Sequence, residues 1–245
     1  MILPLATFSK RLLRAVGPLA LFAAPALTAT LSGTIEIAGA NESAKRNKPD
    51  YSGVVVWLTS PATSSAHTSA KHAMILQRGK KFDPHILPIE AGTSVDFPNL
   101  DPIFHNAFSN FDGQIFDIGL YPPGQTKTVK FDRSGVVRVF CNIHPSMSAI
   151  ILVLNSPYFV VSDRRGHYKL DNVPAGSYTI HFFYERATPE TLNALTQRIA
   201  IVNDTCAPPI RISQAGYLPV AHKNKYGQDY PPASDDVTGY KAPLK

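Results

Sequence analysis

The stretch VVRVFCNIHPSMSAIILVL, residues 136–154, decides how the whole sequence is interpreted. An alternating β-branched segment ends at Phe140, a loop follows, and a second, apolar run extends from Ala149 to Leu154. Short runs rich in Val, Ile and Phe are typical of strands, and a run that is apolar at every position is typical of a buried strand. The pattern predicts two strands joined by the loop 141–147.

This loop carries the spacing C-x-x-H-x-x-M, formed by Cys141, His144 and Met147. Thiolate, imidazole and thioether groups suit copper, and a blue-copper site has two histidines and one cysteine in a plane with a distant axial methionine. A cysteine at a strand end and a histidine three residues later can approach one atom across a tight turn, which Pro145 stiffens. The loop therefore supplies three of the four ligands that such a site needs.

The remaining histidine is expected upstream, and His105 fits this position. It follows a stretch rich in Pro, Asn and Asp at residues 98–102 and precedes a short apolar segment. It lies 36 residues before Cys141, which leaves room for the intervening strands of a Greek-key sandwich. We therefore expect one copper ion held by four side chains: His105, Cys141, His144 and Met147.

The segments around these residues resemble the cupredoxins, the family of plastocyanin, pseudoazurin and amicyanin. The resemblance rests on the short ligand loop and on four further segments: EAGTSVDFPN (90–99), FHN (104–106), LYPPGQ (120–125) and FDRSG (131–135). It covers roughly residues 73–154, with Gln125 where the family usually has Glu. The chain is longer than an amicyanin, and its layout looks more like the plastocyanin-like proteins that carry a methylamine-utilisation label.

The resemblance also implies a role for each residue. His105, Cys141 and His144 would be equatorial ligands, and Met147 would be axial. The backbone N–H of Asn106 would point at the thiolate, because groups around the ligands tune such sites. His144 would be partly exposed among apolar side chains, where electrons enter and leave.

Most of the remaining patterned segments are also typical of strands, and turn residues separate them. Further strands are expected at residues 34–37, 53–58, 73–76, 86–89, 94–97 and 126–131. This rhythm predicts an all-β fold, a Greek-key sandwich of cupredoxin type. The best helix candidate is the segment 189–194, which Thr188 can cap.

A second unit is expected after Asn155. Residues 158–213 resemble the carboxypeptidase-regulatory-like, or transthyretin-like, modules, through Asp163–Gly166, Tyr168–Leu170 and Val173–Tyr178. The resemblance implies a smaller accessory β-sandwich. The expected organisation is a signal peptide (1–29), a cupredoxin domain with an N-terminal β extension (30–156), this second sandwich (157–215) and an extended tail (216–245).

The N-terminus predicts export. Lys10, Arg11 and Arg14 precede an apolar, small-residue run, and Ala24-Pro25-Ala26 offers an A-x-A cleavage pattern, with Ala29 as a second site. An uncleaved membrane anchor is the alternative, although the run is short for a span. Cleavage leaves 21 basic against 18 acidic residues, too small an excess to predict a nucleic-acid partner. We expect a periplasmic protein with no membrane span after cleavage.

The two cysteines offer a rival interpretation. In an oxidising compartment a pair of cysteines usually forms a disulfide. If Cys141 and Cys206 are bridged, the protein is a structural or binding module of the cell envelope. If Cys141 binds copper, Cys206 is left without this partner.

The sequence thus predicts a type 1 copper protein that carries single electrons between redox partners and is not an enzyme. The partner is expected to be another redox protein whose identity the sequence does not give. Copper storage or delivery without electron traffic, with the same ligands, is the second alternative.

Overall fold

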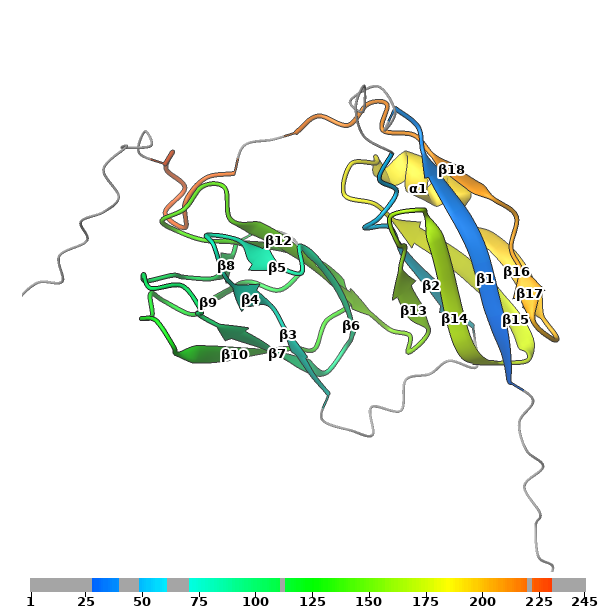
Figure 1. Ribbon diagram of the computed structural model, residues 1–245, viewed down its shortest axis with the longest axis horizontal. Helices are drawn as coiled ribbons and strands as arrows, with labels where there is room; N and C mark the ends of the chain where they lie inside the picture. Colours follow the sequence, from blue (N-terminus) through cyan, green and yellow to red (C-terminus); the bar gives the residue numbers. More distant parts are fainter. Residues whose placement is uncertain (1–27, 40–48, 61–70, 111–112, 220–221, 231–245) are drawn as a thin grey trace, which may run out of the picture.

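The computed structural model describes residues 28–39, 49–60, 71–110, 113–219 and 222–230. The expected signal peptide lies outside the described residues except for Thr28 and Ala29, which begin the first strand. Cleavage after Ala29 would therefore remove two residues from that strand. The described residues form two β-sandwiches that contact each other (Figure 1).

The first unit, here called the inserted sandwich, is built from residues 72–154. One sheet has the order β10 (Thr126–Phe131), β7 (Thr93–Pro98), β3 (His72–Met74). The other has the order β6 (Ile86–Glu90), β12 (Ser148–Leu154), β11 (Gly135–Phe140), β8 (Phe108–Ser109), β9 (Phe116–Asp117). A short pair, β4 (Leu76–Gln77) and β5 (Phe82–Asp83), completes the unit.

The two strands predicted from residues 136–154 are β11 and β12. They pair antiparallel from Gly135 opposite Val153 to Phe140 opposite Ser148. Strand β12 is apolar on both faces because each face is covered. Ala149, Ile151 and Val153 belong to the core of the inserted sandwich, whereas Leu152 and Leu154 pack against Val55 of the other unit.

The second unit, the split sandwich, is assembled from both sides of the inserted one. In one sheet β1 (Thr28–Ile37) lies between β14 (His167–Pro174) and the strands β17 (Thr205–Cys206) and β18 (Ile210–Ile212). The other sheet has the order β13 (Phe159–Val161), β2 (Val55–Thr59), β15 (Gly176–Phe183), β16 (Gln197–Ile201). This confirms the all-β fold.

The expected division between the domains differs from this pairing. Strands β1 and β2 were expected to extend the cupredoxin domain, but they are internal strands of the split sandwich. The apolar side chains of β1 alternate, and Leu31 and Ile35 join Val56 and Leu58 of β2 in one core with Tyr168. Because these side chains need an apolar partner surface, the strands pair with distant segments rather than with the next ones along the chain.

The two sandwiches meet through an apolar contact and charged groups at its edge. Val55, Leu152 and Leu154 are buried at the contact. Nε2 of His85 lies 2.7 Å from a carboxylate oxygen of Glu185, which follows β15.

The helix α1 (Pro189–Leu195) begins and ends close to the predicted bounds. The hydroxyl of Thr188 accepts a hydrogen bond from the backbone N–H of Thr191, so Thr188 is the N-cap as predicted. Among the described residues, none lies in a helix long and apolar enough to cross a membrane.

Candidate metal centre

The loop between β11 and β12 is closed by its own backbone. The N–H of Cys141 donates to the carbonyl of Met147 at 3.2 Å, and the N–H of Met147 donates to the carbonyl of His144 at 3.0 Å. The loop therefore folds back on itself, and both sulfur-bearing side chains are completely buried. Cys141 and Met147 belong to the same apolar cluster.

His105 is held on a separate segment between β7 and β8. Its backbone N–H and carbonyl both pair with Tyr121, at 3.2 and 2.9 Å. The hydroxyl of Tyr121 in turn donates to the carbonyl of Phe97 at 2.8 Å and accepts from the side chain of Gln77. His105 is thus fixed at its backbone in a fully buried position.

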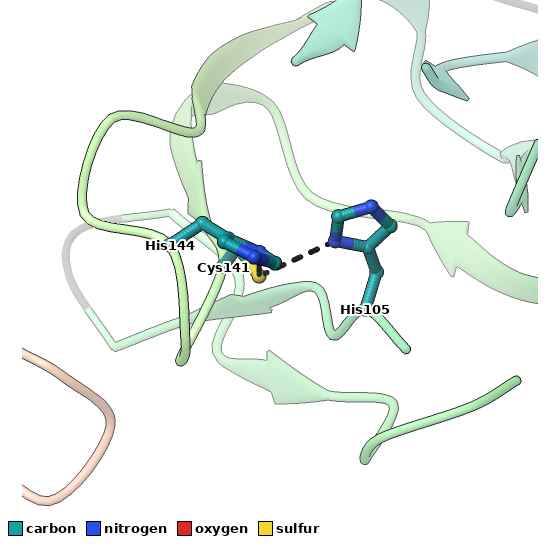
Figure 2. Close-up of side chains that lie close together, drawn as sticks. All are labelled: His105, Cys141 and His144. Carbon is teal, nitrogen blue, oxygen red and sulfur yellow. Dashed lines mark hydrogen bonds between the residues drawn. The ribbon is translucent and has the colours of Figure 1, made fainter. Parts of the chain in front are cut away.

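These two segments bring three donor groups together (Figure 2). Nδ1 of His105 lies 4.0 Å from Sγ of Cys141, and Nδ1 of His144 lies 3.6 Å from the same sulfur. One donor atom from each residue lies within 4.8 Å of the others. In the part of the chain that the structure describes, this is the one group of three His, Cys or acidic side chains so arranged.

The spacing fits a shared metal ion. An ion bound at about 2.0 Å to nitrogen and about 2.3 Å to sulfur in a trigonal plane separates the two donor atoms by roughly 3.7 Å. The observed separations of 3.6 and 4.0 Å are close to this value. The donor set of two imidazoles, a thiol and a nearby buried thioether is therefore compatible with copper.

The far side of the His105 ring is fixed by a carboxylate. Nε2 of His105 lies 2.8 Å from Oδ2 of the buried Asp101. Asp101 also accepts hydrogen bonds from the backbone N–H groups of Gly79 and Lys80, at 2.6 and 2.8 Å. Burial alone would raise the pKa of Asp101, but these N–H groups and His105 outweigh it and lower the pKa. An ionised Asp101 accepts from Nε2–H and leaves Nδ1 free to face the sulfur.

The cysteine is a thiol in the absence of a cation. Burial raises the pKa of Cys141, while the backbone N–H groups of Ile143, Asn106 and His144 work in the opposite direction. The contribution of Asn106 is the one expected from the resemblance. A buried sulfur surrounded by N–H donors can hold negative charge once a cation compensates the desolvation.

His144 is the most accessible member of the group. Burial is the main cause that lowers the pKa of His144, and electrostatic interactions with His105 and Lys80 lower it further, to about 4. Its ring is only partly buried, as predicted. At neutral pH it is therefore an uncharged imidazole, the form that binds metals.

Exposed apolar side chains lie beside the centre. Ile143 precedes His144, Phe104 precedes His105, and Leu120 precedes Tyr121, the backbone partner of His105. Their exposed fractions are 43%, 38% and 52%. These three residues and His144 are called here the apolar rim, because each of the three is next in the chain to a ligand candidate or to its backbone partner.

The tail also reaches the centre, which the sequence does not predict. Nε2 of His222 donates to the carbonyl of Pro145 at 2.8 Å, and the hydroxyl of Tyr230 donates to the carbonyl of Cys141 at 2.9 Å. The tail was expected to be an extended segment, and its contact with the ligand loop was not predicted. No periodic pattern marks such contacts, because each joins a single side chain to a single backbone carbonyl.

The two cysteines are not bridged. Both are free, Cys141 buried in the inserted sandwich and Cys206 exposed on β17 of the split sandwich. The disulfide alternative is therefore wrong for this structure. The thiol of Cys141 remains available to a metal.

No protein-family model and no curated protein matches the chain. Similar solved structures include a copper-containing nitrite reductase from Thermus scotoductus SA-01 (27% identity, TM-score 0.32), a purple cupredoxin from Nitrosopumilus maritimus (24%, 0.32) and an amicyanin mutant (19%, 0.33). The matches cover 33%, 34% and 40% of this chain, and 22%, 99% and 98% of the other chains. The chain thus spans about a fifth of the nitrite reductase and nearly all of the two small cupredoxins. The likeness is partial, and the site described above stands on its own residues.

Proposed function

We propose that this protein binds one copper ion and carries single electrons between redox partners. The observation that carries the proposal is that His105, His144 and Cys141 each bring one donor atom within 4.8 Å of the others, with Nδ1 of both histidines facing Sγ of Cys141. These three would be the equatorial ligands, and Met147, buried in the same cluster as Cys141, would be the axial ligand.

The donor set favours copper over the metals that commonly share its ligands. Zinc sites use histidine, cysteine and carboxylates, whereas a thioether is a soft donor that suits Cu(I). Met147 is completely buried beside a buried cysteine rather than exposed at the surface. When bound, copper would supply a one-electron couple between Cu(I) and Cu(II).

The residues around the ligands favour a centre that changes little between the two oxidation states. His105 is held by Tyr121 at its backbone and by Asp101 at its ring. The ligand loop is closed by the hydrogen bonds of Cys141 and Met147. Ligands that are fixed before the metal binds keep the rearrangement on electron transfer small, which suits a carrier.

His144 and the apolar rim support a route for the electron. His144 is the one ligand candidate that is not fully buried, so its ring would be the nearest part of the centre to a docked partner. Ile143 and Leu120 provide an apolar surface for a short-lived contact with a redox protein. We therefore propose a carrier rather than an enzyme, exported to the periplasm as the N-terminal sequence predicts.

The test is electron exchange between copies of the copper-loaded protein. Proton NMR lines of the Cu(I) form should broaden in proportion to added Cu(II) protein, as expected when electrons pass between copies. Tight copper binding without such broadening, and without oxidation by a small soluble oxidant, would instead indicate storage or delivery.

A further inference from the structure

Residues 222–230, here called the tail strap, lie against the ligand loop although they belong to neither sandwich (Figure 1, orange to red). The ring of His222 stacks on Phe140 at a centroid distance of 4.0 Å. Its Nε2 reaches the carbonyl of Pro145, and the hydroxyl of Tyr230 reaches the carbonyl of Cys141. The strap therefore contacts both arms of the loop.

A closed ring of hydrogen bonds joins the strap to both ligand segments. The backbone N–H of Lys225 donates to Oδ1 of Asn142 at 3.0 Å, and the N–H of Asn142 donates to Oδ1 of Asn106 at 3.2 Å. Asn106 donates through Nδ2 to Asp117 at 2.7 Å, and Asp117 accepts from Nζ of Lys225 at 2.8 Å. The ring connects the neighbour of His105, the neighbour of Cys141 and the strap.

This ring fixes the distance between the two ligand segments. Asn106 and Asn142 each follow a ligand candidate directly, and they are bonded to each other. Lys225 and Asp117 complete the ring from outside, so neither asparagine can turn away without breaking a further bond. Side chains whose own partners are fixed in this way hold a site more closely than loop residues alone.

We propose that the tail strap is a constituent of the metal centre, in which Tyr230, His222 and Lys225 are positioning residues for the ligand loop. Tyr230 and His222 hold the loop at the carbonyls of Cys141 and Pro145, and Lys225 holds it through Asn142. The strap also keeps water from the backbone beside Cys141. Its effect on copper rests on the proposed function, whereas its protection of the Cys141 thiol requires no metal.

The first experiment uses the metal-free protein with Cys206→Ser, so that Cys141 is the remaining thiol. A chain that lacks residues 222–245 is compared with a chain that lacks only residues 231–245. The rate of reaction with a chromogenic aromatic disulfide should be about tenfold higher or more in the shorter chain, because loss of the strap lets the loop open. Equal rates in two chains with the same circular dichroism spectrum would overturn the proposal.

The second experiment changes a single hydroxyl. Tyr230→Phe removes the bond to Cys141. The control is Tyr217→Phe, since Tyr217 precedes the strap and lies near Tyr184 of the split sandwich. Tyr230→Phe should raise the thiol reaction rate in the metal-free protein and lower the reduction potential of the copper form. The potential falls because water that reaches the loop favours the more positively charged oxidised centre. Tyr217→Phe should change neither quantity.

The two proposals can fail separately. If no chain acquires a thiolate–copper spectrum, the copper function is wrong, and the thiol reaction rates still test the strap. If Tyr230→Phe and Tyr217→Phe have the same potential and the same thiol reactivity, the Tyr230 hydroxyl has no positioning role, whatever the metal does.

Discussion

The carboxylate of Asp101 lies 2.8 Å from Nε2 of His105, on the side of the ring opposite Cys141. Two backbone N–H groups, from Gly79 and Lys80, hold the carboxylate in this position. The pair therefore selects the tautomer in which Nδ1 of His105 is free to bind a metal.

Substitution of Asp101 should weaken copper binding without removing it. In Asp101→Ala the His105 ring loses its partner and can turn or change tautomer, so copper affinity should fall about 10–100-fold. A competition titration with a chelator of known affinity measures this change. The control is Asp132→Ala, an exposed aspartate that pairs with Lys130. Equal affinities in the two variants would show that Asp101 does not orient the ligand.

Substitutions of Met147 and Met74 should have different effects on the reduction potential of the copper-loaded protein. Met147→Leu keeps a buried apolar side chain but removes the thioether, so the blue absorption should persist while the reduction potential rises. The potential rises because loss of an axial donor disfavours Cu(II) more than Cu(I). Met74→Leu, at a position 49% exposed, should leave the potential unchanged. An unchanged potential in Met147→Leu would mean that Met147 is not a ligand.

Whether the sequence predicts a contact in this centre depends on how far apart the two residues lie along the chain. Cys141, His144 and Met147 lie within one loop, so their spacing in the sequence was enough to predict all three as candidate ligands. The bond from Tyr230 to Cys141 spans 89 residues and involves a backbone carbonyl that any residue would offer. Asp101 lies four residues before His105, but that spacing predicts a contact only in a helix, and this segment is a loop.

The same reasoning applies to the fold. Short alternating segments identified the strands, and Thr188 identified the start of the helix. They did not identify the partners of β1, because an alternating strand fits the face of either sandwich equally well. Only the packing of Leu31 and Ile35 into the core that holds Tyr168 assigns this strand to the split sandwich.

The contact between the sandwiches should depend on pH through His85 and Glu185. The hydrogen bond to Glu185 raises the pKa of His85 against the opposing effect of burial, and the same bond is the main cause that lowers the pKa of Glu185. The raised pKa contributes stability that is present below the unfolded histidine value of about 6.5 and is lost as pH rises through the folded value. The lowered pKa contributes stability that is present above about 4.5 and is lost as pH falls through the folded value.

The pair should therefore stabilise most between about pH 4.5 and 6.5. The His85 side chain is 48% exposed, so solvent screening limits the gain to about 1 kcal/mol or less. Urea unfolding of the wild type and of His85→Gln should give a larger difference in free energy near the middle of this range than at about pH 9. In a Glu185→Gln background this dependence on pH should become much smaller, because the hydrogen bond to the Ser148 carbonyl is then the remaining contact that raises the pKa of His85. A dependence of unchanged size there would show that Glu185 does not cause it.

The apolar rim should set the rate of electron exchange. Leu120→Ser makes the rim more polar and should slow exchange between copies of the copper-loaded protein, since the contact there loses apolar area. Val202→Ser is the matched control, because Val202 is 75% exposed on the split sandwich. Line broadening in mixtures of the Cu(I) and Cu(II) forms measures both rates. If both variants slow electron exchange equally, the contact between copies does not form at the apolar rim.

The most direct test of the central claim is the visible absorption spectrum of the purified protein during titration with Cu(II), beside Cys141→Ser and Cys206→Ser. The account predicts an intense blue band that saturates at one copper per chain in the wild type and in Cys206→Ser, and is absent in Cys141→Ser. A wild-type protein that stays colourless with a free Cys141 thiol, or a band that survives Cys141→Ser, would contradict it.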